Sequence, residues 1–257
     1  MLGKGVLKQK KAQVTLFILI AIAIFAVVLV IFYPRIKVFF APSTPVNFVE
    51  ECVKEDVENA IKTLSLQGGS IKPSFYLENQ GIKIEYLCYT NLYFKTCVMQ
   101  QPMLKQHIER EIKEQVEGKA KACISGLKEE MEKRGYAVSG DYKSLDVRIA
   151  PSNIIITLNA KIAFTKESTQ TFNNFEIRKA SSLYTLVMMA TSILNFEARY
   201  GDSETMTYMF YYPSIKVEKV KQGDGSKIYS LTDISNNEKF VFATRSLSFP
   251  GGYKLSL

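Results

Sequence analysis

Tryptophan is absent from this 257-residue chain, and histidine occurs only once, as His107. Zinc sites normally place two ligands two to four residues apart, whereas the four cysteines include no Cys-x-x-Cys pair. A Ser-His or Cys-His relay would have to use His107, which lies one position off the apolar stripe of its expected helix. That position favours a boundary or solvated side chain. The composition therefore argues against a metal, against any other cofactor and against nucleophilic catalysis.

Motifs for nucleotide and carboxylate chemistry are also missing. The segment 223–227 has glycines and a lysine but lacks the Gly-x-x-x-x-Gly-Lys spacing, which indicates a turn between strands. Adjacent acids occur at Glu50-Glu51 and Glu129-Glu130, but neighbouring helical positions point about 100° apart, so these are expected on solvated faces. No enzyme is predicted. A membrane-tethered enzyme of unrecognised class, assembled from distant acids, stays as an alternative.

Positive charge is concentrated at the start of the chain. The formal net charge is +8, and residues 1–33 hold four lysines (Lys4, Lys8, Lys10 and Lys11) with no acid. The remaining basic residues form no block or stripe, so a nucleic-acid partner is not expected. With 47% hydrophobic and 23% charged residues, the rest of the chain has the composition of an ordinary packed protein.

One long hydrophobic run, Val14 to Tyr33, contains no charge, proline or glycine. Twenty helical residues span about 30 Å, the thickness of the hydrocarbon core of a bilayer. The lysines before it predict a single-pass helix (residues 13–33) with a basic cytoplasmic leader (1–12) and an extracytoplasmic remainder. A cleavable signal is the alternative, but its apolar stretch would be shorter and would end in small residues. Residues 34–46 contain three prolines and indicate a stiff spacer.

The junction Lys10-Lys11-Ala12-Gln13, directly before the apolar run, resembles the class III (type IV prepilin-like) signal of archaeal surface proteins. This resemblance implies that a prepilin-type peptidase cuts between Ala12 and Gln13 and leaves the helix attached. Many pilins carry Glu at the fifth mature position, where this chain has Phe17. The expectation is therefore a monomer or small oligomer, with a pilin-like filament subunit as an alternative.

The extracytoplasmic part shows two kinds of periodicity. Residues 47–135 are expected to form a helix, a hairpin near Thr90-Asn91 and a long amphipathic helix after Pro102. Residues 136–257 alternate apolar and polar positions, with one helical pattern over Ser181–Ala198, and predict an antiparallel sheet with one long helix. The fold class is thus α+β, with three helices beyond the membrane segment.

The four cysteines, Cys52, Cys88, Cys97 and Cys123, all lie in the first half of the chain. Outside the cytoplasm, two disulfides are the expected state, and four cysteines permit three connectivities. Cys88 and Cys97 flank the expected hairpin turn, while Cys52 and Cys123 fall on the apolar faces of two helices. These placements favour Cys88–Cys97 with Cys52–Cys123.

Scattered segments resemble a set of uncharacterised proteins from archaea with reduced genomes. The similar segments are Ala12-Gln13-Val14, Gln67-Gly68-Gly69, Leu87-Cys88-Tyr89-Thr90-Asn91 and Phe242-Ala243-Thr244-Arg245-Ser246. This resemblance implies no activity. The sequence thus predicts a membrane-anchored structural or binding protein of the cell surface. Its expected partners are the lipid bilayer and an unidentified surface molecule.

Overall fold

The computed structural model describes residues 20–25 and 44–248 of the chain. Residues 1–44 and residues 45–257 form two separate units, and in the first unit residues 20–25 are helical. The leader with Lys10–Gln13, the spacer and most of the expected membrane segment lie outside the described residues. Within the described part of the chain, no helix is long and apolar enough to cross a membrane.

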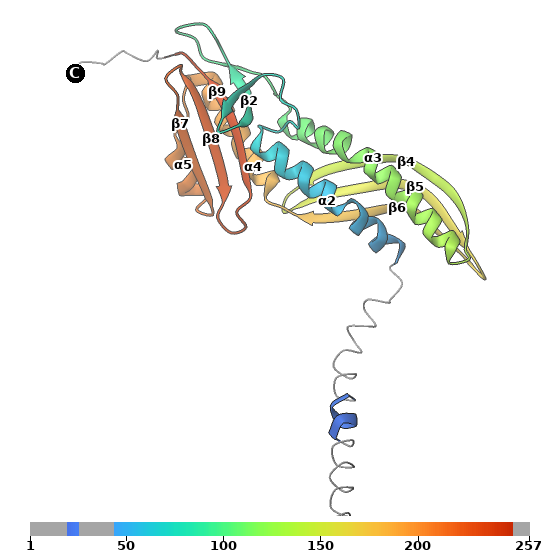
Figure 1. Cartoon of the computed structure of the whole chain (residues 1–257). Helices are drawn as coiled ribbons and strands as arrows, with labels where there is room; N and C mark the ends of the chain where they lie inside the picture. The colour runs from blue at the N-terminus through green and yellow to red at the C-terminus, as the bar shows by residue number, and fades with distance from the viewer. Residues whose placement is uncertain (1–19, 26–43, 249–257) are drawn as a thin grey trace, which may run out of the picture. The chain divides into compact units, whose positions relative to one another are not determined.

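The second unit begins with a helical layer. Helix α2 (Pro45–Leu66) and helix α3 (Leu104–Lys133) lie side by side across one face of a sheet (Figure 1). Each helix buries a stripe at helical spacing: α2 through Val49, Val53 and Val57, and α3 through Ile108 and Ile112 among others. The helices therefore meet through aliphatic side chains, as their periodicity predicts.

The sheet under these helices is an antiparallel meander of three strands: β4 (Ala137–Ala150), β5 (Asn153–Thr165) and β6 (Thr169–Ala180). Its central strand pairs Leu158 with Leu145, and Ile156 with Ile177. Apolar and polar residues alternate along the strands, so one face is directed to the helices and the other to solvent. This part of the expected antiparallel sheet is present.

A second sheet has six strands and is mixed. Its order is β1 (Tyr76–Asn79), β2 (Ile82–Tyr89), β9 (Lys239–Arg245), β8 (Ser226–Asp233) and β7 (Ile215–Lys221), with β3 (Val98–Met99) paired to β2. Strands β2 and β9 run parallel, with Tyr86 opposite Ala243. The remaining pairs are antiparallel. The fold is α+β as expected, but its strands form two sheets, and one pairing is parallel.

Two further helices complete the unit. Helix α4 (Leu183–Tyr200) packs against strands of both sheets, and the short helix α5 (Thr205–Tyr211) lies along β7 (Figure 1). The expectation of three helices was therefore wrong, because α5 makes a fourth in residues 44–248. The hairpin expected near Thr90-Asn91 is only partly present, because residues 91–97 are loop and β2 pairs instead with the two-residue strand β3. One buried cluster contains residues from both sides of position 135, so both sheets share a core.

Candidate functional site

Both disulfides lie in the second unit. Cys52 of α2 is bonded to Cys123 of α3, with the Cα atoms 5.9 Å apart, and Cys88 of β2 is bonded to Cys97 before β3, with the Cα atoms 5.3 Å apart. These are the same two pairs that the helical and hairpin spacing favoured. No cysteine is free. The four sulfur atoms therefore act as cross-links and are not available as nucleophiles or metal ligands.

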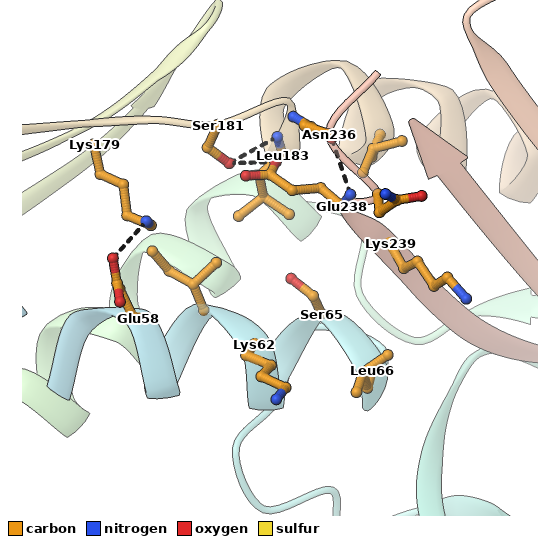
Figure 2. A pocket seen from close by; sticks show the side chains of 13 residues that line it. Glu58, Lys62, Ser65, Leu66, Lys179, Ser181, Leu183, Asn236, Glu238 and Lys239 are labelled. Atoms are coloured by element: carbon orange, nitrogen blue, oxygen red, sulfur yellow. Dashed lines mark hydrogen bonds and ion pairs between the residues drawn. The ribbon is translucent and has the colours of Figure 1, made fainter. Parts of the chain in front are cut away.

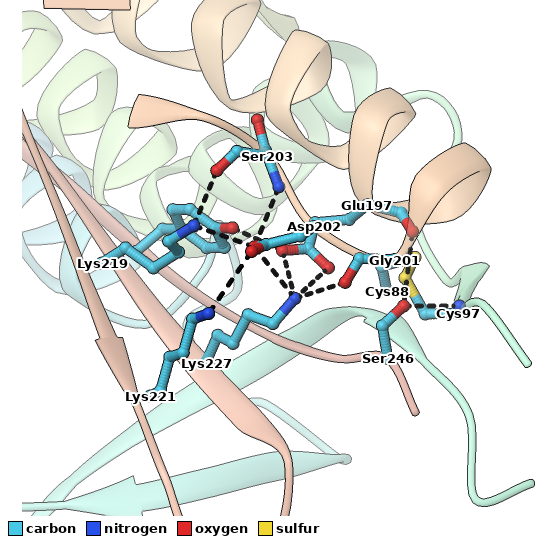
Figure 3. Close-up of polar contacts among 11 residues, drawn as sticks. Cys88, Cys97, Glu197, Gly201, Asp202, Ser203, Lys219, Lys221, Lys227 and Ser246 are labelled. Atoms are coloured by element: carbon cyan, nitrogen blue, oxygen red, sulfur yellow. Dashed lines mark hydrogen bonds and ion pairs between the residues drawn. A yellow bond between two sulfur atoms is a disulfide. The ribbon is translucent and has the colours of Figure 1, made fainter. Parts of the chain in front are cut away.

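A buried network of charges joins α4 to the second sheet (Figure 3). Glu197 of α4 is 0% exposed and Lys227 of β8 is 6% exposed. Lys227 Nζ donates to both carboxylate oxygens of Glu197 at 2.9 Å, to the carbonyl oxygen of Gly201 at 2.5 Å and to Asp202 Oδ1 at 3.2 Å. Tyr229 OH also donates to Glu197 Oε1. Every buried charge in this network therefore has an opposite charge beside it.

The surroundings shift the titration of these groups in opposite directions. Burial raises the pKa of Glu197, although the charge of Lys227 opposes that effect. Burial also raises the pKa of Tyr229, and the adjacent Glu197 carboxylate adds to the rise. Partial burial works against ionisation of Asp202, but the hydrogen bond from Lys219 and the charge of Lys227 outweigh it and lower the pKa of Asp202. Asp202 is therefore a fixed anion, and Tyr229 is a fixed donor.

The same network holds the loop between α4 and α5 in place. Gly201 ends α4 with a φ of +79°, and a Cβ there would collide with Ser248. Lys219 Nζ donates to Asp202 Oδ1 at 2.9 Å and to the carbonyl oxygen of Ser203 at 2.8 Å. Ser203 N also donates to Asp202 Oδ1, at 3.0 Å. The backbone that leads into α5 is thus held by two lysines of the second sheet (Figure 3).

Helix α5 packs Tyr208 and Met209 partly against the core and exposes its other large side chains. None of its seven residues is buried, and among the large hydrophobic side chains there Phe210 is 81% exposed and Tyr211 is 71% exposed. Phe196 and Tyr200 of α4 are exposed as well. Solvent-exposed apolar groups gathered in this way mark interaction sites more often than scattered single residues do.

A cavity of about 530 Å³ lies within this exposed region, and we call it the aromatic cavity. Its lining residues are Ser192, Phe196, Ser203, Glu204, Thr207, Tyr208, Tyr211 and Tyr212. Ser203 is 2% exposed, and its Oγ atom has no hydrogen-bond partner. Glu204 Oε1 accepts a hydrogen bond from Met206 N at 3.0 Å and caps α5. A few polar groups among aromatic walls are typical of a ligand pocket.

A second cavity, of about 580 Å³, lies between α2, the start of α4 and the β8–β9 turn (Figure 2). Its acids already have partners: Glu58 accepts from Lys179 at 2.9 Å, and Glu238 accepts from Ser181 Oγ at 2.9 Å and from Ser182 N at 2.6 Å. The hydrogen bond and charge of Lys179 lower the pKa of Glu58. Glu238 holds the start of α4 and Glu58 is paired, so neither is poised for acid–base chemistry.

His107 is buried, contrary to the boundary or solvated position expected for it. It is 8% exposed, with Ser70 Oγ 2.8 Å from Nε2 and Arg110 Nη2 3.1 Å from Nδ1. Arginine can only donate, so Nδ1 accepts a hydrogen bond, while Nε2 carries the proton and donates a hydrogen bond to Ser70 Oγ. Ser70 in turn donates to Glu85. The Ser70 proton therefore points away from the imidazole, and His107 is not arranged as a base for this serine.

The enclosed position of this cluster sets the pKa values of its members. Burial raises the pKa of Glu85, and burial lowers the pKa of His107. Gly68, with a φ of +79°, allows the close approach of the loop before Ser70, because a Cβ on it would lie 2.8 Å from the Cβ of Glu85. The cluster therefore ties the loop after α2 to α3 and β2.

The remaining sequence candidates have structural roles. The segment 223–227 is a turn between β7 and β8, as expected, in which Asp224 accepts from Ser226 N at 2.9 Å. Glu50, Glu51 and Glu129 are exposed, and Glu130 pairs with Arg134 at 3.0 Å. Within residues 20–25 and 44–248, no group of three or more His, Cys, Asp or Glu residues could hold a metal ion.

The aromatic cavity and the buried charge network were both missed from the sequence. Glu197 falls on the apolar stripe of the helical pattern over Ser181–Ala198, and a carboxylate there requires a buried partner. The run Thr205–Tyr212 carries four aromatic residues in eight positions, which was a second available signal. Comparisons of the chain with protein-family models, with curated proteins and with solved structures find no match.

Proposed function

We propose that this chain is a membrane-anchored, extracytoplasmic binding protein that presents the aromatic cavity of α4 and α5 to a partner. The observation that carries the proposal is the state of α5, whose Tyr208 and Tyr211 line a cavity of about 530 Å³ together with Phe196 and Tyr212. A helix contributes to stability by burying an apolar face, yet α5 packs only the partly buried Tyr208 and Met209 against the core and leaves Met206, Phe210 and Tyr211 exposed.

Two features support the extracytoplasmic location. All four cysteines are paired, and such bonds persist in oxidising compartments. The uncharged run from Val14 to Tyr33 follows four lysines, which places the leader on the cytoplasmic side. In this arrangement a prepilin-type peptidase removes residues 1–12, and Gln13 becomes the first residue of an anchored monomer or small oligomer.

Site-specific photo-crosslinking tests the proposal. A photoreactive phenylalanine analogue replaces Tyr211 in the cavity wall or, as the matched control, Tyr93, which is 67% exposed in the loop before β3. In intact cells that naturally make the protein, irradiation is expected to produce an adduct of defined mass from position 211 and none from position 93. Equal labelling at both positions, or none at position 211, would contradict a binding role for the cavity.

A further inference from the structure

We infer that the aromatic cavity accepts a proline-rich segment in the polyproline II conformation with a basic residue beside its prolines. The inference rests on the proposed function and names the ligand class of the same cavity. Four properties of the cavity support it: the arrangement of its rings, the chemistry of its polar groups, the sign of its charge and the extent of the apolar surface around it.

The rings supply walls with uncovered surface. Four of the eight lining residues are aromatic (Phe196, Tyr208, Tyr211 and Tyr212). Phe196 packs against Tyr200 with centroids 5.8 Å apart, and Tyr211 packs edge-on against Phe210 at 5.4 Å, so each contact is with a ring outside the lining. Proline rings dock between aromatic side chains in known recognition grooves, and a polyproline II helix loses little entropy because it is already extended.

The polar groups of the cavity are mainly hydroxyls. Ser203 Oγ is buried and has no partner, while Ser192 Oγ and Tyr208 OH lie 3.0 Å apart and share one hydrogen bond. A proline-rich segment offers carbonyl acceptors and lacks most of the usual N–H donors, and its backbone makes no internal hydrogen bonds. The Ser203 hydroxyl can donate to such a carbonyl. Its position is fixed, because Lys219 and Asp202 hold the Ser203 backbone.

The charge of the lining is negative. Glu204 is its one charged residue and is exposed. Glu204 Oε1 caps α5, and a carboxylate has further acceptor capacity for a lysine or arginine of the ligand. An anionic ligand would meet this carboxylate with no cation among the lining residues.

The surrounding surface favours an extended protein segment over a single sugar ring. Met206 and Phe210 are strongly exposed next to the cavity and do not line it. A segment that crosses the cavity can rest on these side chains beyond its edge. A polyproline II helix advances about 3.1 Å per residue with three residues per turn, so two turns extend about 19 Å.

Peptide binding to the full-length chain in lipid nanodiscs tests the inference. The probe is a labelled nonapeptide of three Pro-Pro-Lys repeats, followed by fluorescence anisotropy. The Gly-Gly-Lys peptide keeps its charge without the proline rings, and the Pro-Pro-Glu peptide keeps the rings with the opposite charge. We expect the Pro-Pro-Lys peptide to bind at least about tenfold more tightly than either control.

Three cavity variants and one control variant locate the binding. Tyr211→Ala removes an exposed wall ring and should weaken binding about tenfold, whereas Tyr93→Ala should leave it unchanged. Glu204→Gln keeps an oxygen to cap α5 and removes the negative charge. It should therefore reduce the difference in affinity between the Pro-Pro-Lys and Pro-Pro-Glu peptides. Ser203→Ala should weaken binding of the Pro-Pro-Lys peptide without changing the preference for lysine.

Several outcomes would overturn the assignment of the ligand class. One is equal binding of the three peptides, or no binding up to about 1 mM. In another such outcome the Pro-Pro-Lys peptide fails to bind, whereas chitohexaose or vesicles of anionic phospholipid bind. Loss of that binding in Tyr211→Ala would then assign the cavity to a sugar or a lipid. If the peptides fail but position 211 still crosslinks in cells, the ligand class is wrong and the binding function stands. If both fail, the proposed function falls as well.

Discussion

The two halves of the folded unit are stabilised by different kinds of interaction. The half built from α2, α3 and the β4–β6 sheet is held by interdigitated aliphatic side chains and by the Cys52–Cys123 disulfide. The half built from α4, α5 and the β7–β9 strands buries charges around Lys227 and exposes aromatic rings on α5. The difference indicates that the first half acts as a scaffold. In the second half, buried charges fix the loop before α5, and the rings of α5 that form the proposed binding surface are exposed.

The largest expected effect comes from breaking the charge network. Lys227→Met leaves the Glu197 carboxylate buried without its cation, and should lower the free energy of unfolding by about 3–5 kcal/mol. Lys216→Met removes an exposed pair with Glu218 on the same sheet and should cost less than about 1 kcal/mol. Urea unfolding of both variants measures the contrast. The double variant Glu197→Gln/Lys227→Met should recover much of the loss, and a single Lys227→Met variant as stable as Lys216→Met would refute the account.

Removing each disulfide compares the packing of α2 on α3 with the link between β2 and the loop before β3 in the second sheet. The Cys52–Cys123 bond closes a loop of 71 residues and the Cys88–Cys97 bond one of 9 residues. Chain entropy then gives about 4 kcal/mol for the first bond and about 2.5 kcal/mol for the second. Paired Cys→Ala substitutions, followed by thermal or urea unfolding, should rank the bonds in this order. A greater loss for Cys88–Cys97 would show that the short loop matters more to the fold than the packing of α2 on α3.

The free energy of unfolding should depend on pH through the titration of His107. Burial lowers its pKa, so the unfolded chain binds the proton more readily than the folded one. Stability should therefore be unaffected by this residue above about pH 6.5 and should fall as the pH drops below that value. Burial raises the pKa of the nearby Glu85, so the folded chain binds this proton more readily than the unfolded chain. Glu85 should therefore add to the free energy of unfolding as the pH falls through its raised pKa.

Substitution of His107 separates its contribution to the pH dependence from that of Glu85. His107→Gln can keep hydrogen bonds to Ser70 and Arg110 and cannot titrate, so its unfolding free energy should vary less between pH 5 and pH 7, values that bracket the usual pKa of about 6.5. Urea unfolding across this range measures the slope. An unchanged slope in the variant would assign the pH dependence to other groups.

The smallest change in the free energy of unfolding is expected for Ser203→Ala, because the Ser203 hydroxyl, unlike that of Ser226, has no hydrogen-bond partner. Ser203 Oγ is unpaired, so Ser203→Ala should leave the free energy of unfolding unchanged or raise it by up to about 1 kcal/mol. Ser226 Oγ, by contrast, lies 2.8 Å from Tyr86 OH and donates to Asp224 at 2.8 Å, so Ser226→Ala should cost about 1 kcal/mol or more. Differential scanning calorimetry compares the two. Equal losses would mean that the Ser203 hydroxyl stabilises the fold.

Local patterns were sufficient for much of the scaffold half. The spacing of Val49, Val53 and Val57 predicts helix α2, and the alternation through Leu145 and Leu158 predicts antiparallel strands there. The disulfide pairs also followed, because each cysteine lies on an apolar face or beside a turn. Such features depend on neighbours a few positions away in the chain, where backbone geometry fixes the direction of each side chain.

The candidate site was less accessible to the same reasoning. Glu197 falls within an apolar stripe of its helix, but its partner Lys227 is 30 residues away in a segment whose sequence indicates a turn. His107 was expected near solvent from its position on the helix. Its burial results from contacts with Ser70 and Glu85, which belong to other elements and are not visible in the pattern of that helix. Helix α5 was missed entirely, since seven residues are too few to show a helical period.

The sequence by itself therefore determined the α+β class, three of the four helices of the folded unit, the antiparallel strands within residues 137–180 and the favoured disulfide pairs. The tertiary structure decided the parallel pairing of β2 with β9, the enclosure of His107, the charge network and the exposure of α5. The physical reason is that these features join segments far apart in the chain, as Tyr86 and Ala243 are. Periodicity specifies which face of an element is apolar, whereas packing of the whole core decides which faces meet and which stay exposed to solvent.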